Sequence, residues 1–157
     1  MSESGLKIGS GSICSGDESA WNRESYSPHD TEAIGDQPDK LRVLIVDDER
    51  LIADTCAEIL EGAGFHTGTA YDGWTALNLA AAFHPDYLLT DVLMPRMNGV
   101  ELAICISQLL PATRILLFSG QAGISDILSH GREQGYDFEL IAKPLHPTKL
   151  IEHLRKQ

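Results

Sequence analysis

The chain has 157 residues, 43% of them hydrophobic, which suits one domain of ordinary size with a packed core. Its formal net charge of -11 argues against a nucleic-acid-binding surface, which is expected to be basic. No apolar run approaches the length of a membrane span, and no apolar segment of a signal peptide follows Lys7. We therefore expect a cytoplasmic protein with neither nucleic acid nor membrane as a partner.

Residues 1–40 differ in composition from the rest of the chain. They are rich in Ser and Gly, carry eight acidic and three basic residues, and contain few large aliphatic side chains. Such a segment cannot bury enough apolar area to offset the entropy lost on ordering. The sequence therefore predicts a disordered acidic tail over 1–40 and a folded domain over 41–157.

Apolar strand-like runs recur through the folded domain and alternate with helical stripes of three- and four-residue spacing. The predicted strands cover 41–46, 65–70, 86–90, 113–118 and 138–142. Asp72 and Asn98 are placed to cap helices, and Pro147 suits a first helical turn. Strand–helix units in series predict an α/β fold, in which helices cover both faces of a doubly wound, five-stranded parallel sheet. We expect the flavodoxin-like strand order 2-1-3-4-5.

Polar residues follow four of the five predicted strands. They are Asp47 and Asp48 after the first strand, Asp91 after the third, Ser119 after the fourth and Lys143 after the fifth. Parallel strands bring their carboxyl ends to one edge of the sheet, where ligands bind in open α/β folds. The strand order also places the first and third strands side by side, so the three aspartates are expected to lie together.

Three neighbouring carboxylates repel one another, and a hard divalent cation such as Mg²⁺ relieves that repulsion. Asp47 and Asp48 alone would fit an ordinary helix N-terminus, but that interpretation does not account for the polar residues at the other strand ends. A carboxylate such as Asp91 can attack phosphorus to give an acyl phosphate. Lys143 and Ser119 could then neutralise and hydrogen-bond the phosphoryl oxygens.

Four sequence segments carry a specific resemblance to a known family. They are Val-Leu-Ile-Val-Asp-Asp-Glu at 43–49, Leu-Leu-Thr-Asp-Val-Leu-Met-Pro at 88–95 with Asn98-Gly99 after it, Leu-Phe-Ser-Gly at 117–120, and Lys143-Pro144. The region from Leu41 onward, about three-quarters of the chain, resembles a response-regulator receiver domain of bacterial two-component signalling.

The resemblance implies a phosphorylation site at Asp91. It implies direct Mg²⁺ ligation by Asp48, Asp91 and the backbone carbonyl of Leu93, with Asp47 acting through a bound water. Ser119 and Lys143 would contact the phosphoryl group, and the bond between Lys143 and the following proline would be cis. The donor would be a histidine kinase or a histidine phosphotransfer protein, and the chain would be a signalling domain, not an enzyme in the ordinary sense.

One position departs from the family pattern. The switch aromatic normally lies three residues before the lysine, where this chain has Leu140, and Phe138 lies two residues further upstream. This departure leaves the phosphorylation chemistry intact but puts the usual output mechanism in doubt.

With no second folded domain expected, we interpret the chain as a stand-alone receiver. Its phosphorylated form would alter a protein-binding surface over 123–134, 138–142 and 146–156, and the downstream protein is unknown. A phosphate shuttle or sink and a non-signalling structural adaptor remain alternatives. A phosphohydrolase fits poorly, because Leu93 stands where such an enzyme has its second aspartate.

Overall fold

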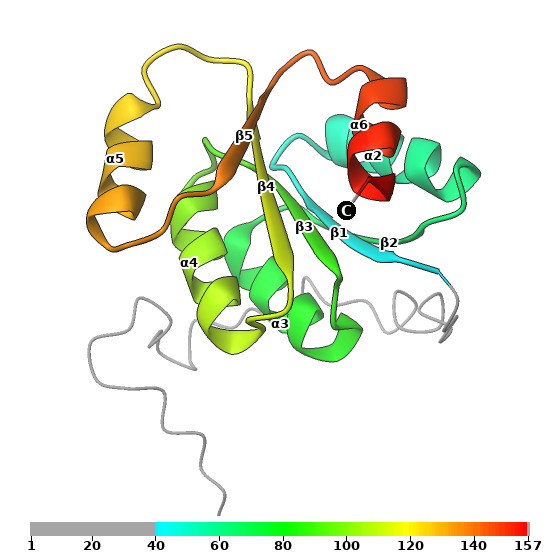
Figure 1. The fold of residues 1–157 in the computed structure, drawn as a ribbon, viewed down its shortest axis with the longest axis horizontal. Coiled ribbons are helices and arrows are strands. Elements are labelled where there is room, and N and C mark those ends of the chain that lie inside the picture. The colour runs from blue at the N-terminus through cyan, green and yellow to red at the C-terminus, as the bar shows by residue number, and fades with distance from the viewer. Residues whose placement is uncertain (1–39, 157) are drawn as a thin grey trace, which may run out of the picture.

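The computed structural model of the chain describes residues 40–156. The predicted acidic tail over 1–40 lies outside this range except for Lys40, so its disorder stays a prediction. Figure 1 shows a single sheet with helices on both sides. The elements, in chain order, are β1 (Arg42–Val46), α2 (Arg50–Gly62), β2 (His66–Ala70), α3 (Gly73–Phe83), β3 (Tyr87–Asp91), α4 (Gly99–Leu109), β4 (Arg114–Ser119), α5 (Ser125–Glu133), β5 (Glu139–Ala142) and α6 (Pro147–Arg155).

The five strands form one parallel sheet in the order β2-β1-β3-β4-β5. This confirms the predicted fold and strand order. Each strand begins one residue later than predicted, a difference within the usual uncertainty of element boundaries. β3 and β4 also extend by one residue at their carboxyl ends, because Asp91 pairs with Phe118 and Ser119 pairs with Ala142.

Both faces of the sheet are covered by helices, which explains why β1 is almost wholly apolar. Alternate residues of β1 point to opposite faces: Leu44 packs toward α3 and α4, whereas Ile45 packs toward α2 and α6. A third cluster, which includes Val100 and Ile124, joins α4 to the segment that begins α5. Figure 1 shows the resulting layers, with α2 and α6 on one side and α3 and α4 on the other.

Local hydrogen bonds fix the helix starts that the sequence predicts. Asp72 accepts a hydrogen bond from the Thr75 backbone N–H at the start of α3. Asn98 begins α4 with a capping box, in which its side chain and that of Glu101 bond reciprocally to the backbone. At α2 the N-cap residue is Glu49, whose side chain makes no capping hydrogen bond. Asp47 and Asp48 therefore do not serve as the N-cap of α2.

The loop from β3 to α4 is held tightly against the end of β3. The Gly99 backbone N–H donates to the Val92 carbonyl at 2.9 Å. A Cβ atom on Gly99 would overlap the carbonyl oxygen of Asp91 and touch the backbone of Val92. Gly99 is thus required for the close approach that fixes the backbone at Asp91.

We expect Gly99→Ala to lower the free energy of unfolding by about 1–3 kcal/mol, because backbone atoms must move to admit the methyl group. Chemical denaturation measures the change. Gly62→Ala is the matched control, since a Cβ atom there meets nothing within 4 Å and alanine is favoured over glycine in a helix. Equal stabilities of the two variants would contradict the close approach.

Candidate functional site

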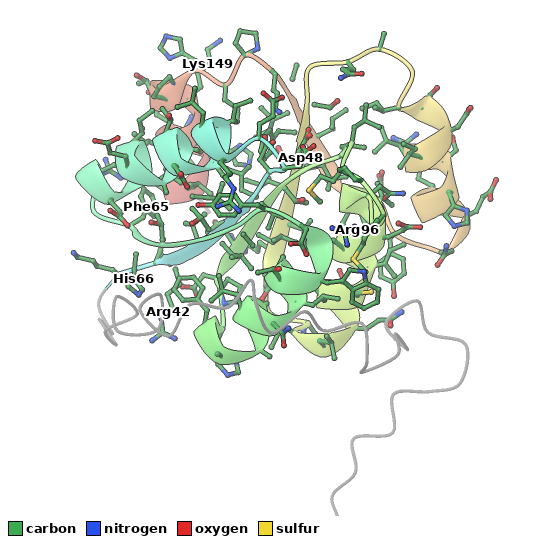
Figure 2. The ribbon with its side chains drawn as sticks, turned by 180° about the vertical axis from the view of Figure 1, so that it is seen from behind. Arg42, Asp48, Phe65, His66, Arg96 and Lys149 are labelled. Carbon is green, nitrogen blue, oxygen red and sulfur yellow. The ribbon has the colours of Figure 1, made fainter. Side chains whose placement is uncertain are left out.

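The structure brings the predicted polar residues to one edge of the sheet. Asp47 and Asp48 directly follow β1, Asp91 ends β3, Ser119 ends β4, and Lys143 directly follows β5. β1 lies beside β3, and β4 lies between β3 and β5, so four adjacent strands contribute to the cluster. Figure 2 shows Asp48 at this edge, whereas Arg42, at the start of β1, lies toward the opposite end of the domain.

The three aspartates present carboxylate oxygens that lie within 4.8 Å of one another. Asp47 is fully buried, Asp91 is 8% exposed, and Asp48 is exposed. One oxygen of Asp47 accepts a hydrogen bond from the Glu49 backbone N–H at 2.9 Å, which fixes the orientation of that carboxylate. The cluster is therefore buried at Asp47 and Asp91 and open to solvent at Asp48.

Lys143 bridges two of these carboxylates. Its Nζ atom lies 3.1 Å from an oxygen of Asp47 and 3.4 Å from an oxygen of Asp91. Burial by itself lowers the pKa of Lys143, but the hydrogen bond to Asp47 and the charges of both aspartates outweigh it and raise the pKa above its ordinary value. Lys143 is therefore a firmly charged ammonium group at neutral pH.

The surroundings of Asp91 disfavour its charged form, whereas those of Lys143 favour the charged form of the lysine. Burial is the main cause that raises the pKa of its carboxyl group above the ordinary value. Lys143 acts against this rise, whereas the charges of Asp47 and Asp48 add to it. When no cation other than Lys143 is bound, ionisation of Asp91 is therefore less favourable in the folded protein than in the unfolded chain.

Ser119 lies beside the cluster with little exposure. Its Oγ atom accepts a hydrogen bond from the Gln121 backbone N–H at 3.3 Å, and its carbonyl accepts one from the Lys143 N–H at 2.9 Å. Leu93 follows Asp91 by two residues and packs its side chain against the third hydrophobic cluster. The peptide bond between Lys143 and Pro144 is cis, as the resemblance implied.

The residues fit a divalent cation. Three carboxylates and one ammonium leave two formal negative charges, and carboxylate oxygens are the ligands that Mg²⁺ prefers. Burial, with a smaller contribution from the charges of Asp47 and Asp48, raises the pKa of Asp91 despite the nearby Lys143, so a bound cation would favour its ionised form. The exposed Asp48 leaves the cluster open to an ion from solvent.

Two features of the site were not predicted from the sequence. The ring of Phe118 lies beneath the Lys143 ammonium, with 4.6 Å between Nζ and the ring centroid. An apolar groove of about 550 Å³ also lies between α2 and the loop from β5 to α6, and Lys143 is one of the residues that line it. The helical and strand patterns signalled that these side chains were apolar, but not which of them face the site.

The groove is bordered by Leu51, which is 79% exposed and the most exposed large hydrophobic residue in the described part of the chain. Cys56 lies on the same wall. Burial, with a smaller effect from the charge of Asp47, raises the pKa of the Cys56 thiol to about 11. The thiol is thus neutral at physiological pH, and Lys143 is the only charged side chain that lines the groove among the described residues.

Within residues 40–156, no helix is long and apolar enough to cross a membrane.

Comparisons with known proteins point to one family. The model of the response regulator receiver domain matches residues 43–155. Protein PilG of Pseudomonas aeruginosa is 31% identical over 117 residues, which cover 73% of this chain and 85% of PilG. The DNA-binding response regulator MtrA of Mycobacterium tuberculosis is also 31% identical, over 115 residues. That match covers 73% of this chain but only 49% of MtrA, so the chain spans about half the length of that relative.

Solved structures show the same likeness. The chemotaxis protein CheY4 of Vibrio cholerae superposes with a TM-score of 0.64 and 28% identity, over 74% of this chain and 98% of CheY4. A CheY-like receiver domain protein from Methanospirillum hungatei gives a TM-score of 0.67 and 27% identity, over 74% of this chain and 92% of that one.

The raised pKa of Asp91 predicts that Asp91→Asn is more stable than the unsubstituted protein at pH 7 without divalent cations. A carboxyl group whose pKa is higher in the folded than in the unfolded state costs stability above the unfolded pKa, and the cost disappears below it. The advantage of the variant should therefore shrink as the pH falls toward about 4, the ordinary aspartate pKa.

Denaturant unfolding between pH 4 and pH 8 in the presence of a chelator measures this difference. Glu58→Gln, which neutralises an exposed carboxylate of α2, is the control and should show no comparable gain. A variant less stable than the parent at pH 7, by an amount independent of pH, would contradict the electrostatic account of Asp91.

Proposed function

Because the chain belongs to the response regulator receiver domain family, we propose that it accepts a phosphoryl group on Asp91 in a two-component phosphorelay. The observation that carries the proposal is the convergence of Asp91 with two other carboxylates and the ammonium of Lys143 at the carboxyl edge of the sheet. A structural adaptor has no need for such a cluster, which is costly to bury.

In the proposed reaction a carboxylate oxygen of Asp91 attacks the phosphorus atom carried by a histidine nitrogen of the donor. The phosphorus–nitrogen bond breaks as the phosphorus–oxygen bond forms, and the imidazole keeps the electron pair. Lys143, whose Nζ atom lies 3.4 Å from Asp91, would neutralise one phosphoryl oxygen. The Ser119 hydroxyl, at the end of the neighbouring strand, would donate a hydrogen bond to another.

We propose Mg²⁺ as the cofactor of this site. Asp48 and Asp91 would hold it directly with the backbone carbonyl of Leu93, and Asp47 would act through a water molecule. When bound, Mg²⁺ supplies the positive charge that the carboxylates lack and offsets the charge of the phosphoryl oxygens. Asp47, held by Lys143 at 3.1 Å and by the Glu49 N–H, is the most constrained of the three carboxylates.

The donor we propose is a histidine kinase or a histidine phosphotransfer protein. The apolar groove between α2 and the loop from β5 to α6 supports a protein donor, because Lys143, which lines the groove, also contacts Asp91. The exposed Leu51 at its border offers apolar area for contact. A donor side chain buried there would bring the phosphohistidine toward Asp91.

The proposal predicts that acetyl phosphate with Mg²⁺ adds one phosphoryl group to the full chain. Intact-mass analysis should detect one adduct, which a chelator abolishes and which Asp91→Asn lacks. Beryllofluoride, a stable mimic of the acyl phosphate, serves if turnover is too fast for the adduct to accumulate. Failure of the unsubstituted protein to form the adduct and to bind beryllofluoride would contradict the proposal.

The output we propose is a change in the surface formed by α5, β5 and α6, which would bind a downstream protein. A phosphate shuttle or sink is the second candidate, and Leu140 favours it. Leu140 replaces the usual switch aromatic, lies on the edge strand β5 and is 41% exposed. An already exposed leucine offers no inward rotamer change of the kind that an aromatic residue makes in the family.

Backbone amide NMR shifts on addition of Mg²⁺ and beryllofluoride separate these two outputs. A signalling receiver should show shifts that extend across α5, β5 and α6, beyond the loops that surround the bound anion. Shifts confined to the loops at the carboxyl edge would favour the shuttle. Asp91→Asn under the same conditions controls for effects of Mg²⁺ alone.

A further inference from the structure

We propose that Phe118 is a positioning residue for Lys143: its ring holds the lysine ammonium in the place from which it serves the phosphoryl group. This inference rests on the proposed phosphorylation of Asp91 but concerns a contact that exists before any phosphate arrives. The Lys143 Nζ atom lies 4.6 Å from the centroid of the Phe118 ring, a distance typical of a cation–π interaction.

The environment makes this contact strong. Phe118 is fully buried at the end of β4, and the Lys143 side chain is only 20% exposed. Little water therefore screens the ammonium from the electron-rich face of the ring. Cation–π contacts are strongest when both groups are desolvated in this way.

Both neighbours of Ser119 in the chain hold Lys143. Phe118 supports its ammonium, and Gly120 lies beneath the start of its side chain. A Cβ atom on Gly120 would lie only 3.2 Å from the Lys143 Cβ, so the lysine packs closely against the glycine. The Lys143 backbone N–H donates to the Ser119 carbonyl at 2.9 Å and completes the attachment. The two residues proposed to contact the phosphoryl oxygens are therefore held by one local structure.

The ring supplies a contact that phosphorylation does not remove. Lys143 otherwise depends on carboxylate oxygens of Asp47 and Asp91, and the Asp91 carboxylate is consumed when it becomes an acyl phosphate. The lysine ammonium must then contact the phosphoryl group while it stays at the site. Phe118 carries no charge and takes no part in the bond changes, so its attraction for the ammonium persists throughout the reaction.

A hydrophobic core alone does not require an aromatic ring at this position. Leu116 and Leu117 precede Phe118 in β4 and are buried without one. A leucine at 118 would also fill apolar space, but it would present no electron-rich face to the ammonium. The ring is thus what distinguishes this position from the rest of the strand.

Graded fluorination of the Phe118 ring tests the proposal in the full chain. Replacement of Phe118 by mono-, di- and trifluorophenylalanine withdraws electron density from the ring face with little change of shape. We expect the rate of phosphorylation by acetyl phosphate to fall stepwise, by roughly three- to tenfold at trifluorophenylalanine. In the Lys143→Met background the residual rate should not depend on fluorination. In the fluorinated proteins that keep Lys143, the affinity for Mg²⁺ should stay unchanged.

Phe83 provides the matched control. It is equally buried in the core, and its ring packs against His66, away from the site. Trifluorophenylalanine at position 83 should leave the phosphorylation rate unchanged. A phosphorylation rate that does not change with fluorination at position 118 would overturn the positioning role. Equal changes in rate on fluorination at positions 83 and 118 would overturn it as well.

Unfolding measurements keep this test separate from the proposed function. Fluorination of Phe118 should reduce stability more in the parent than in the Lys143→Met background, which reports the contact without phosphate. Such coupling in a protein that neither forms the phosphoryl adduct nor binds beryllofluoride would contradict the phosphoacceptor function and leave the contact between ring and lysine intact. Absence of coupling would overturn the inference about Phe118, whether or not Asp91 is phosphorylated.

Discussion

The domain depends on one electrostatic arrangement, in which a single ammonium is shared by two carboxylates at the carboxyl edge of the sheet. Lys143, directly after β5, reaches across β4 to Asp47 after β1 and to Asp91 at the end of β3. The contacts therefore tie β5 to β1 and to β3. Three carboxylates still face a single ammonium, and burial raises the pKa of Asp91 despite the contact with Lys143. A site with that deficit is suited to bind a cation and, with it, an anionic phosphoryl group.

The fold and the membership of the site followed from the sequence for a physical reason. Parallel strands buried on both faces give near-continuous apolar runs, and a polar residue followed four of the five predicted strands. Strand order then fixed which ends are neighbours, so Asp47 and Asp91 could be placed together before any geometry was known. The cap residues Asp72 and Asn98 were predictable because their side chains act within a few residues of their own position.

The remaining features required three-dimensional contacts between distant segments. The sequence does not reveal that Phe118 faces Lys143, because the ring could equally have pointed toward either face of the sheet. The groove beside Leu51 likewise forms only where α2 meets the loop after β5. Gly99 lies in a segment that carries the family resemblance. The need for glycine there comes from a tertiary contact, because the backbone of Asp91 occupies the space that a methyl group would fill.

The most direct measurement is a crystal structure of the full chain with Mg²⁺ and beryllofluoride. We expect beryllium bonded to an Asp91 carboxylate oxygen, with fluorides contacting the Ser119 hydroxyl and the Lys143 ammonium above the Phe118 ring. We also expect Mg²⁺ bound by Asp48, Asp91 and the carbonyl of Leu93. Beryllofluoride bound elsewhere, or absent from a crystal in which Mg²⁺ occupies the cluster, would contradict the assignment of Asp91 as the phosphoacceptor.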